Sequence, residues 1–559
     1  MQIIKSLVKL FVFICPLGAL AQSTYLYDGA KEYKLIDRLE IKQQANTGLN
    51  FTTMKPYSRK FVVQQAEFID SASQKSNFKL TKIDRYNLNS LLMNNSEWVT
   101  GSQQGFLSKK PLFKSFYKTK SNLLEVNTKD FFLVVNPVLQ LNISASSDSE
   151  RIFLNTRGVN VRGRIADKLG FSAQMTENQE RGPLFFRERV QNLRAVPGVG
   201  FYKIYKNSSA VDYFDARGYI TFNAIKYIDF QLGYDKNFIG NGYRSLFLSN
   251  EGNSYLFAKI NTKIWKINYQ NIFMELMPQF KKRSDTLLDR KYAAIHHLSM
   301  NVTKWLNIGV FESVVFGRKN NFDFQYLNPI IFYRHIEGTL GSPDNAMAGF
   351  DFKANVARKF QFYGQFLLDE LIVSKLRNDP TNWVNKFGIQ AGAKYIDALG
   401  IKNLDLQLEI NRVRPFTYSH NDTIANYTHY NQPLAHPLGA NFEEIIGILN
   451  YQPAPKWYVH AKAIYYKLGL DSAGKNFGGN IFRDYRTRVG ENGYSIGSGS
   501  TAKCFNGLLQ VSYELKENLF FDLSLQYRKY KLATLPDFKN ATLFTAGIRL
   551  NMAKRVYDY

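Results

Sequence analysis

The sequence predicts an all-β protein with a small α region: a transmembrane antiparallel β-barrel of about 18 strands, preceded by a short N-terminal helical periplasmic region. Three observations support this prediction. The chain begins with an export signal, later segments alternate apolar and polar residues with a period of two, and the links between those segments alternate between short and long. The expected divisions are a signal peptide at 1–21, the helical region at 22–125 and the barrel at 126–559.

The N-terminus has the three parts of a secretory signal peptide. Lys5 and Lys9 supply positive charge, residues 10–20 are mostly apolar, and Ala19-Leu20-Ala21 matches a small-residue cleavage site. A lipoprotein signal ending at Cys15 is a rival, but the residue before it is bulky and the preceding apolar run is short. Beyond the cleavage site no stretch approaches the roughly 18 apolar residues of a transmembrane helix.

Composition narrows the class of protein. Hydrophobic residues make up 45% of the chain and aromatic residues 15%. In a chain without an apolar helix, this fits a barrel whose strands face lipid with every second residue, and a large soluble all-β secreted protein is the alternative. The formal net charge of +26 favours anionic partners such as lipopolysaccharide phosphates or acidic glycans, and export argues against nucleic acid. Cleavage would leave Cys504 as the one cysteine, so no intrachain disulfide is expected.

The region 22–125 contains two segments with apolar residues at helical spacing, the first of them after Pro56. The positions are Phe61, Val62, Ala66, Phe68 and Ile69 in the first segment, and Leu80, Ile83, Leu88, Leu91 and Leu92 in the second. We therefore expect two or three helices in this region.

From about Phe131 the period changes to two. In residues 404–411, Leu404, Leu406, Leu408 and Ile410 share one face, whereas Asp405, Gln407, Glu409 and Asn411 share the other. The segments 228–235, 521–528 and 544–551 repeat this pattern. One apolar and one strongly polar face predict strands between lipid and a polar lumen.

The links between the predicted strands alternate in length. Strand starts are expected near Phe131, Arg151, Lys168, Arg217, Tyr227, Asn253, Ile264, Tyr292, Trp305, Ala346, Phe360, Lys386, Lys402, Ala440, Lys456, Lys503, Asn518 and Ala541. Short links fall at 166–167, 226, 262–263, 303–304, 358–359, 397–400, 452–455 and 516–517, and long ones at 179–216, 236–252, 317–345, 413–439 and 469–502. Short periplasmic turns that alternate with long extracellular loops are typical of bacterial outer-membrane barrels.

Aromatic residues follow most short links, as expected for a girdle at one membrane interface. They are Phe171, Tyr227, Trp265, Trp305, Phe360, Trp457 and Phe520. An alternating last strand followed by the terminal Tyr559 is similar to the signal read by the barrel-assembly machinery.

Catalytic and metal-binding signatures are not found in the sequence, so we expect neither an enzyme nor a cofactor. His296-His297 and Glu443-Glu444 lie in alternating segments, where neighbouring side chains point to opposite faces and cannot chelate one ion.

Two basic constellations are candidate binding sites. Arg162 and Arg164 share the luminal parity of their strand. They can bind an anion or pair with luminal carboxylates such as Asp229, Asp405 and Glu409, and pairing is the favoured interpretation.

The second candidate is the long loop NIFRDYRTRVGENGY, in which basic and aromatic side chains alternate. The candidate glycan-binding residues are Arg483, Tyr485, Arg486, Arg488 and Tyr494. Guanidinium groups suit carboxylates or phosphates, and aromatic faces suit sugar rings. A loop packed on itself over the pore is an equal alternative.

Four segments resemble a known family: NFTTMKPYSR (50–59), FLNTRGVNVRG (153–163), GYDKNFIGNGYRSLFLSN (233–250) and YLNPIIFYR (326–334). They are similar to the Wzi-like capsule-assembly outer-membrane proteins, and within that family to the RemB branch of Bacteroidetes gliding-motility proteins. The resemblance implies a helical N-terminal region, an 18-stranded barrel, and a non-catalytic role in holding or organising surface polysaccharide. The gliding branch further implies a surface role in motility, with the gliding machinery as a partner.

Three functions compete. The favoured one is a non-enzymatic outer-membrane protein that retains surface polysaccharide or supports gliding. The second is a diffusion channel for small solutes, which requires an open lumen, whereas the helical region and long links such as 326–334 are expected to occlude it. The third, a barrel enzyme, requires a convergent triad or carboxylate cluster that the sequence lacks.

Overall fold

The computed structural model describes residues 23–559 except 76–77, 148–149, 167, 207–208, 280–286 and 331. The predicted signal peptide and Asp167 of one short link lie outside the described residues. Among the described helices, none combines the length and the apolar character needed to cross a membrane.

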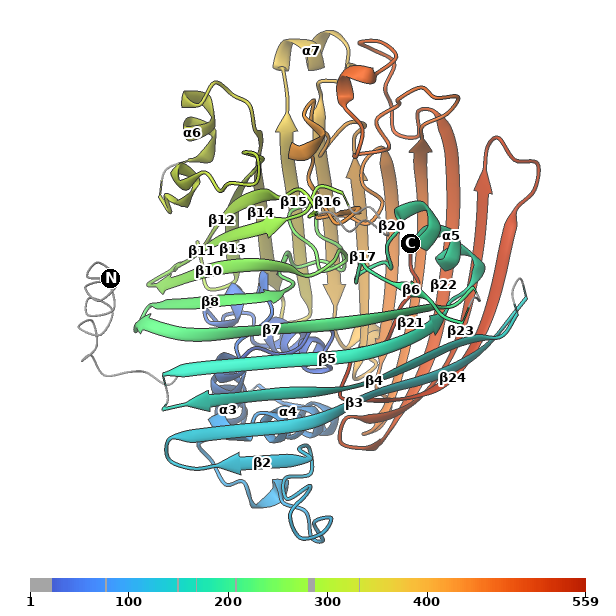
Figure 1. Cartoon of the computed structure of the whole chain (residues 1–559). Coiled ribbons are helices and arrows are strands. Elements are labelled where there is room, and N and C mark those ends of the chain that lie inside the picture. Colours follow the sequence, from blue (N-terminus) through green and yellow to red (C-terminus); the bar gives the residue numbers. More distant parts are fainter. Residues whose placement is uncertain are drawn as a thin grey trace.

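A closed antiparallel barrel of 18 strands forms the wall (Figure 1). The strands are β3 (Phe131–Ser146), β4 (Ile152–Ile165), β5 (Leu169–Arg181), β7 (Val211–Ile225), β8 (Ile228–Asp235), β10 (Tyr255–Ile264), β11 (Ile267–Leu276), β12 (Lys291–Asn301), β13 (Leu306–Phe316), β14 (Asn345–Val356), β15 (Phe360–Glu370), β16 (Lys386–Tyr395), β17 (Leu404–Val413), β20 (Phe442–Tyr451), β21 (Trp457–Leu470), β22 (Ser500–Lys516), β23 (Leu519–Leu532) and β24 (Lys539–Leu550). Pairing of β24 with β3 closes the barrel. Each predicted start lies within three residues of an observed one, except that β7 begins at Val211 rather than near Arg217.

The predicted division into lipid and luminal faces is confirmed. On β17, Leu408 and Ile410 are 54% and 46% exposed, whereas Glu409 and Asn411 are fully buried. On β23, Phe521, Leu523, Leu525 and Tyr527 are exposed on the outside, and Asp522, Ser524, Gln526 and Arg528 are buried inside. A period of two therefore places apolar side chains toward lipid and polar ones toward the lumen.

The predicted interface girdle is present, with one error. Tyr227, Trp265, Trp305 and Trp457 are exposed on the outer surface next to short links. Phe520 is instead 6% exposed and lies beneath the Lys31 ammonium group inside the barrel. Its neighbour Phe521 is the outward residue, since consecutive strand residues face opposite sides.

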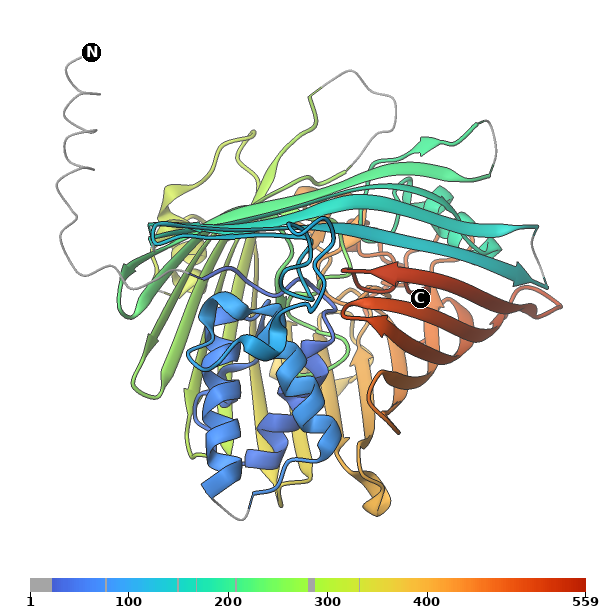
Figure 2. The same ribbon diagram turned by 90° about the horizontal axis from the view of Figure 1, so that it is seen from below.

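The predicted helical region is confirmed. It comprises α2 (Glu32–Gln43), α3 (Arg59–Lys75) and α4 (Lys82–Asn94), with the short elements η1 (Leu49–Phe51), β1 (Met54–Lys55), η2 (Ser96–Trp98), η3 (Gln104–Phe106) and β2 (Leu124–Asn127). Seen from below, the helices lie in the barrel mouth that carries the short links (Figure 2). Thr81 begins α4 with a capping box to Asp84.

Ion pairs attach this helical region to the barrel wall. They join Lys31 to Glu514 at 2.6 Å, Asp37 to Lys394 at 2.7 Å, Arg38 to Asp397 at 3.0 Å and Glu40 to Lys353 at 2.8 Å. The region is therefore a plug for the periplasmic opening.

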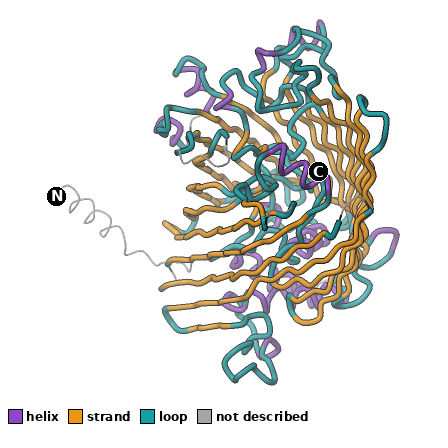
Figure 3. The backbone as a smooth tube through the Cα atoms, turned by 45° about the vertical axis from the view of Figure 1, so that its right-hand side comes forward, coloured by secondary structure: helices purple, strands orange, loops and turns teal. Residues whose placement is uncertain are grey.

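Several links carry short elements of their own. These are α5 (Leu184–Leu193), β6 (Lys203–Ile204), β9 (Phe238–Ile239), η4 (Phe324–Leu327), α6 (Tyr333–Thr339), α7 (Val373–Asn378), η5 (Ala398–Gly400), η6 (Thr423–Ala425), β18 (Thr428–His429), β19 (Gln432–Pro433) and η7 (Tyr485–Thr487). Figure 3 shows loops and short helices gathered at the end of the barrel opposite the plug.

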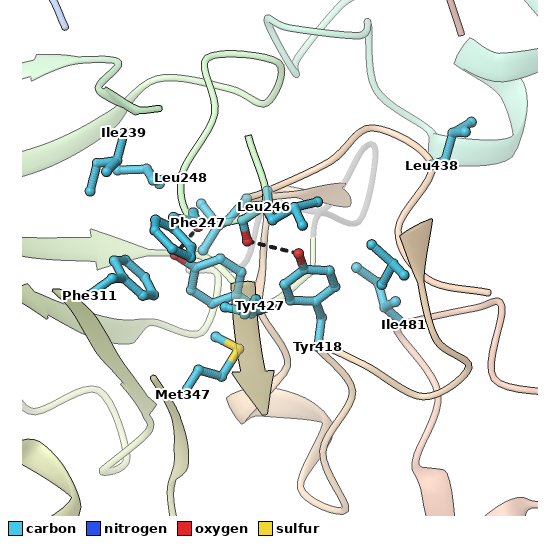
Figure 4. Packing of buried hydrophobic residues seen from close by; sticks show 14 of the residues in the cluster. Ile239, Leu246, Phe247, Leu248, Phe311, Met347, Tyr418, Tyr427, Leu438 and Ile481 are labelled. Carbon is cyan, nitrogen blue, oxygen red and sulfur yellow. Dashed lines mark hydrogen bonds between the residues drawn. The ribbon is translucent and has the colours of Figure 1, made fainter. Parts of the chain in front are cut away.

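The link between β8 and β10 folds into the lumen and fills it. Its residues Leu246, Phe247 and Leu248 are fully buried among aliphatic and aromatic side chains from several strands and loops. Tyr418 and Tyr427 donate hydrogen bonds to the carbonyls of Leu246 and Phe247 at 2.8 and 2.7 Å (Figure 4). The same link pairs with the plug, because β9 forms a two-stranded sheet with β1. The segments 50–59 and 233–250 singled out in the sequence therefore meet inside the barrel.

The last residues also enter the lumen, which the sequence did not predict. After β24 ends at Leu550, the chain leaves the wall and turns inward, and the Asp558 carboxylate pairs with Lys462 at 2.8 Å. Tyr559 contacts Phe185 and lies beneath the Arg189 guanidinium group, both in α5. Tyr559 therefore lies inside the barrel, nine residues beyond the end of the last strand, and the similarity to an assembly signal stays a prediction.

The link 317–344 was expected to occlude the pore, and this expectation was wrong. Tyr326, Tyr333 and Ile336 pack on Val314 and Phe316, which belong to the outward parity of β13. Figure 1 shows α6 outside the wall. Its position follows from an apolar surface on the outside of β11 to β13 that the link covers.

Candidate functional site

Three long links interlock at the extracellular end. They join β15 to β16 (371–385), β17 to β20 (414–441) and β21 to β22 (471–499), and together we call them the extracellular cap. Backbone hydrogen bonds run from Trp383 N to Glu491 O and from Tyr494 N to Thr381 O, each at 2.9 Å. The cap is therefore one packed surface rather than three separate loops.

An aromatic and basic cluster lies on this cap. The rings of Trp383 and Tyr485 have centroids 4.9 Å apart, and the Arg488 guanidinium carbon lies 4.0 Å from the Trp383 ring centroid. The Lys386 ammonium group lies 4.5 Å from the Tyr485 centroid, and His420 meets the same ring edge-on. Half-buried aromatic faces next to cations suit a polymer with sugar rings and acidic groups.

The predicted loop arginines are already ion-paired. Arg483 pairs with Asp471 at 2.8 Å, Arg486 with Asp484 at 2.8 Å, and Arg488 with Glu491. The exposed fractions of the three side chains are 31%, 64% and 19%, so Arg486 is the most accessible of them. Each guanidinium group thus stabilises the loop and keeps only part of its donor capacity for a ligand.

Tyr494 lies apart from the cluster surface. Its side chain is 2% exposed, and its hydroxyl accepts hydrogen bonds from the Val489 and Gly490 backbone at 3.0 Å. Its ring packs edge-on against Phe416 at 4.8 Å. Tyr494 therefore holds the loop on the cap, and the structure brings Tyr485, Arg486 and Arg488 together at the surface without it.

The electrostatics of the cap keep its carboxylates ionised. Hydrogen bonds from Arg488 and Trp383 lower the pKa of Glu491. Burial raises the pKa of Asp484, but hydrogen bonds from Arg486 outweigh it, so this pKa is also lowered. Burial lowers the pKa of His420, which is therefore neutral at physiological pH.

Two further cations lie on α7 (Val373–Asn378), in the same link as Trp383. Lys375 and Arg377 are exposed, and within the described ranges no ion pair involves either of them. Lys375 is near enough to Glu491 to lower the pKa of that carboxyl. Lys375, Arg377 and Trp383 were not predicted from the sequence as site residues. A usable signal existed for Trp383, because it is a tryptophan within a long link rather than beside a short one.

The other candidate from the sequence, Arg162 and Arg164, faces the lumen as predicted. Arg162 is 3% exposed, pairs with Glu97 and donates to the Asn94 carbonyl at 2.9 Å. Arg164 lies 4.8 Å from the Trp98 ring centroid. The favoured interpretation, pairing with a carboxylate, agrees with this geometry. The partner is in the plug and not among the strand carboxylates named from the sequence.

A further basic residue, Arg244, is buried inside the barrel. Its side chain is 1% exposed and pairs with Glu251 at 3.0 Å, Glu444 at 3.4 Å and Asp558 at 3.8 Å. The Glu409 carboxylate accepts from the backbone of Tyr243 and Arg244. This network joins the inward link, the wall and the C-terminal residues.

The C-terminal residues 552–559 contribute to the lining of two sizeable cavities. One of about 500 Å³ borders the plug and β5 to β8, and one of about 370 Å³ borders the plug and β21 to β24. Across the part of the chain that the structure describes, no group of His, Cys, Asp or Glu is arranged to hold a metal ion. His296 and His297 bind different carboxylates, Glu312 and Asp351, on opposite faces of β12.

These features define a class: an outer-membrane β-barrel with a periplasmic plug, a filled lumen and a cap of interlocked loops. The family model for the capsule assembly protein Wzi matches residues 205–543. Because that match covers more than half of the chain, the chain belongs to the Wzi capsule assembly family. No curated protein sequence matches it significantly.

The comparison with solved structures finds similarity at low sequence identity. One is Wzi of Escherichia coli, described as a carbohydrate-binding β-barrel involved in group 1 capsule assembly. It is 13% identical, with a TM-score of 0.57 over 95% of this chain and 100% of that one. OprD of Pseudomonas aeruginosa and OccAB2 of Acinetobacter baumannii are each 9% identical. Each covers 75% of this chain, and 95% and 97% of their own, with TM-scores of 0.41.

Proposed function

We propose that this protein is a non-enzymatic outer-membrane protein that holds anionic surface polysaccharide on its extracellular cap. The observation that carries the proposal is the Trp383–Tyr485–Arg488 cluster, with Arg486, Lys375 and Arg377 beside it. Membership of the Wzi family, and the carbohydrate binding in the description of the Escherichia coli structure, support it.

The chemistry of the cap fits an acidic polymer. The Trp383 and Tyr485 rings offer apolar faces for sugar rings, and the cations of α7 and Arg486 offer charge for uronate or other acidic groups. The chain's formal charge of +26 adds long-range attraction that salt screens. Binding without reaction suits a site that lacks a nucleophile–base pair, so we propose no catalysis.

A diffusion channel is the weaker proposal. The plug, the link 236–254 and the C-terminal residues meet in the lumen through the Arg244 network and the β1–β9 pairing. A role in gliding motility, with the gliding machinery as partner, is a further proposal that rests on the resemblance of the four sequence segments. Whether the protein retains polysaccharide or supports gliding, the outer-membrane lipid, including lipopolysaccharide, surrounds it.

The test is binding of acidic cell-surface polysaccharide by the purified barrel. We expect a variant with Lys375→Ser, Arg377→Ser and Arg486→Ser to bind several-fold more weakly at low salt, and wild-type binding to fall with added salt. The matched control is Lys109→Ser, Lys110→Ser and Lys114→Ser, which removes equal charge from exposed positions on the plug side. Equal loss in both variants, or no loss in the first, contradicts the site.

A further inference from the structure

The link 317–344 lies against the outer face of the wall. Its described residues, 317–330 and 332–344, form what we call the outer flap. Tyr326, Tyr333 and Ile336 of the flap are buried against Tyr292 and Val314 of the wall. Those wall residues have the same parity as Leu298 and Val310, which are exposed on the lipid side. The flap therefore covers a part of the wall that would otherwise face lipid.

The covered wall carries polar side chains of outward parity. His296 Nδ1 lies 2.7 Å from Glu312 Oε1, and the Tyr333 backbone N–H donates to the other Glu312 oxygen at 3.0 Å. The Tyr333 ring stacks on His296 with centroids 4.0 Å apart. Tyr269 also donates to the Pro329 carbonyl. The flap supplies partners for groups that hydrocarbon would leave unsatisfied.

The depth of this contact follows from strand geometry. A strand advances about 3.3 Å per residue, and a tilt of about 40° reduces this to about 2.5 Å along the membrane normal. Glu312 lies seven residues beyond Trp305, which marks the periplasmic interface, so it sits about 18 Å above that interface. The apolar band of such barrels is about 25 Å tall. The base of the flap is therefore at the level of the outer leaflet.

The outer side of the flap is apolar and exposed. Phe324, Ile330 and Phe332 are 77%, 82% and 72% exposed. Lys319 of the same link is exposed, and the Arg334 side chain is 74% exposed although it pairs with Glu337 at 2.7 Å. Large apolar side chains close to this depth, with cations whose long side chains can extend to the interface, match the acyl chains and phosphates of an anionic lipid.

We propose that the outer flap is a lipid-binding element. Phe324, Ile330 and Phe332 insert among acyl chains of the outer leaflet, and Lys319 and Arg334 contact the headgroup phosphates. The depth of the flap favours lipid over a soluble partner. Contact with lipid also anchors the link beside the extracellular cap and keeps the His296–Glu312 pair shielded.

The test places a fluorescent probe on the flap. Ile330→Cys is labelled with an environment-sensitive dye in a Cys504→Ala background and reconstituted in vesicles that contain spin-labelled phosphatidylcholine. The matched control is Val489→Cys, which is 52% exposed on the cap. We expect blue-shifted emission and several-fold stronger quenching at 330 than at 489, whereas equal emission and quenching at the two positions overturn the proposal.

Two further measurements test whether a second copy of the protein covers the flap and whether its cations contact headgroup phosphates. Disulfide cross-linking between Ile330→Cys copies at high lipid-to-protein ratio should give no dimer, and a dimer with an unquenched probe assigns the patch to a second copy and overturns the proposal. Adding phosphatidylglycerol to the vesicles should move the dye at position 330 deeper into the bilayer in the labelled Ile330→Cys protein. It should not do so when Lys319→Ser and Arg334→Ser are added to that protein. An identical response in both proteins would show that Lys319 and Arg334 do not contact headgroup phosphates. Heat-modifiability on unboiled gels verifies that each variant folds.

Discussion

Replacing Arg244 with alanine should destabilise the filled lumen strongly. The guanidinium group is 1% exposed, pairs with Glu251, Glu444 and Asp558, and donates to the Asp558 carbonyl at 2.7 Å. Removing one partner of a buried ion pair costs about 3–5 kcal/mol, because the remaining charge is left uncompensated. His436 and Lys462 still contact Glu444 and Asp558, so we expect a loss of about 3 kcal/mol, the lower end of that range.

The assay is guanidinium-induced unfolding in detergent micelles, followed by tryptophan fluorescence. Arg157→Ala is the matched control, because its pair with Glu177 is exposed on the barrel exterior and should not move the midpoint measurably. Arg244→Lys should recover part of the loss, since lysine keeps the charge but not the planar fork. If Arg244→Ala unfolds at the wild-type denaturant concentration, the network is not what holds the lumen together.

Three more predictions follow from the same geometry. Leu408→Arg should lower the folding stability by about 2–4 kcal/mol because the side chain faces lipid. Gln407→Arg on the luminal side should lower it far less. Equal losses of heat-modifiability in the two variants would refute the assignment of one face to lipid and the other to the lumen. Deleting 552–559 joins the two luminal cavities and should raise single-channel conductance in planar bilayers above the wild-type level, so unchanged conductance would show that other segments close the lumen. Burial raises the pKa of Asp84, but Arg38 and Lys42 hold it below its ordinary value. Both partners lie on α2 of the plug, so this lowered carboxyl pKa stabilises the packing of α4 on α2 above about pH 4, and the effect is lost as pH falls through the folded-state pKa. Pepsin should therefore cleave the wild-type plug faster as pH falls below about 4. Cleavage of the Asp84→Asn variant should depend less on pH. A wild-type plug that resists pepsin equally across this range would contradict the prediction.

The wall was predictable because its signals are local. A period of two fixes which side chains face lipid, and the alternation of link lengths fixes which strands are neighbours, so the 18 strands and the faces of β17 and β23 follow from short stretches of sequence. One prediction for the wall was wrong, because Phe520 and Phe521 are both aromatic and only one of two consecutive strand residues can face outward.

The paths of the long links were not predictable, because contacts distant in sequence determine them. Arg244 meets Asp558 across 314 residues, and Tyr333 meets His296 on the far side of the wall from the lumen. Within the loop 480–494, the composition identified Tyr485, Arg486 and Arg488 at the cap surface, but it could not show that Tyr494 is buried or that Trp383 of another link completes the cluster.

The most direct test of the account is the fate of surface polysaccharide in a deletion strain. We predict that the deletion moves acidic polysaccharide from the cell-bound fraction to the medium while total production stays constant. Complementation should restore retention with the wild-type gene and with the Lys109→Ser, Lys110→Ser, Lys114→Ser control, but not with the Lys375→Ser, Arg377→Ser, Arg486→Ser variant. Scoring colony spreading of the same strains tests the gliding proposal. An unchanged cell-bound fraction in the deletion strain would contradict the claim that this protein holds polysaccharide at the cell surface.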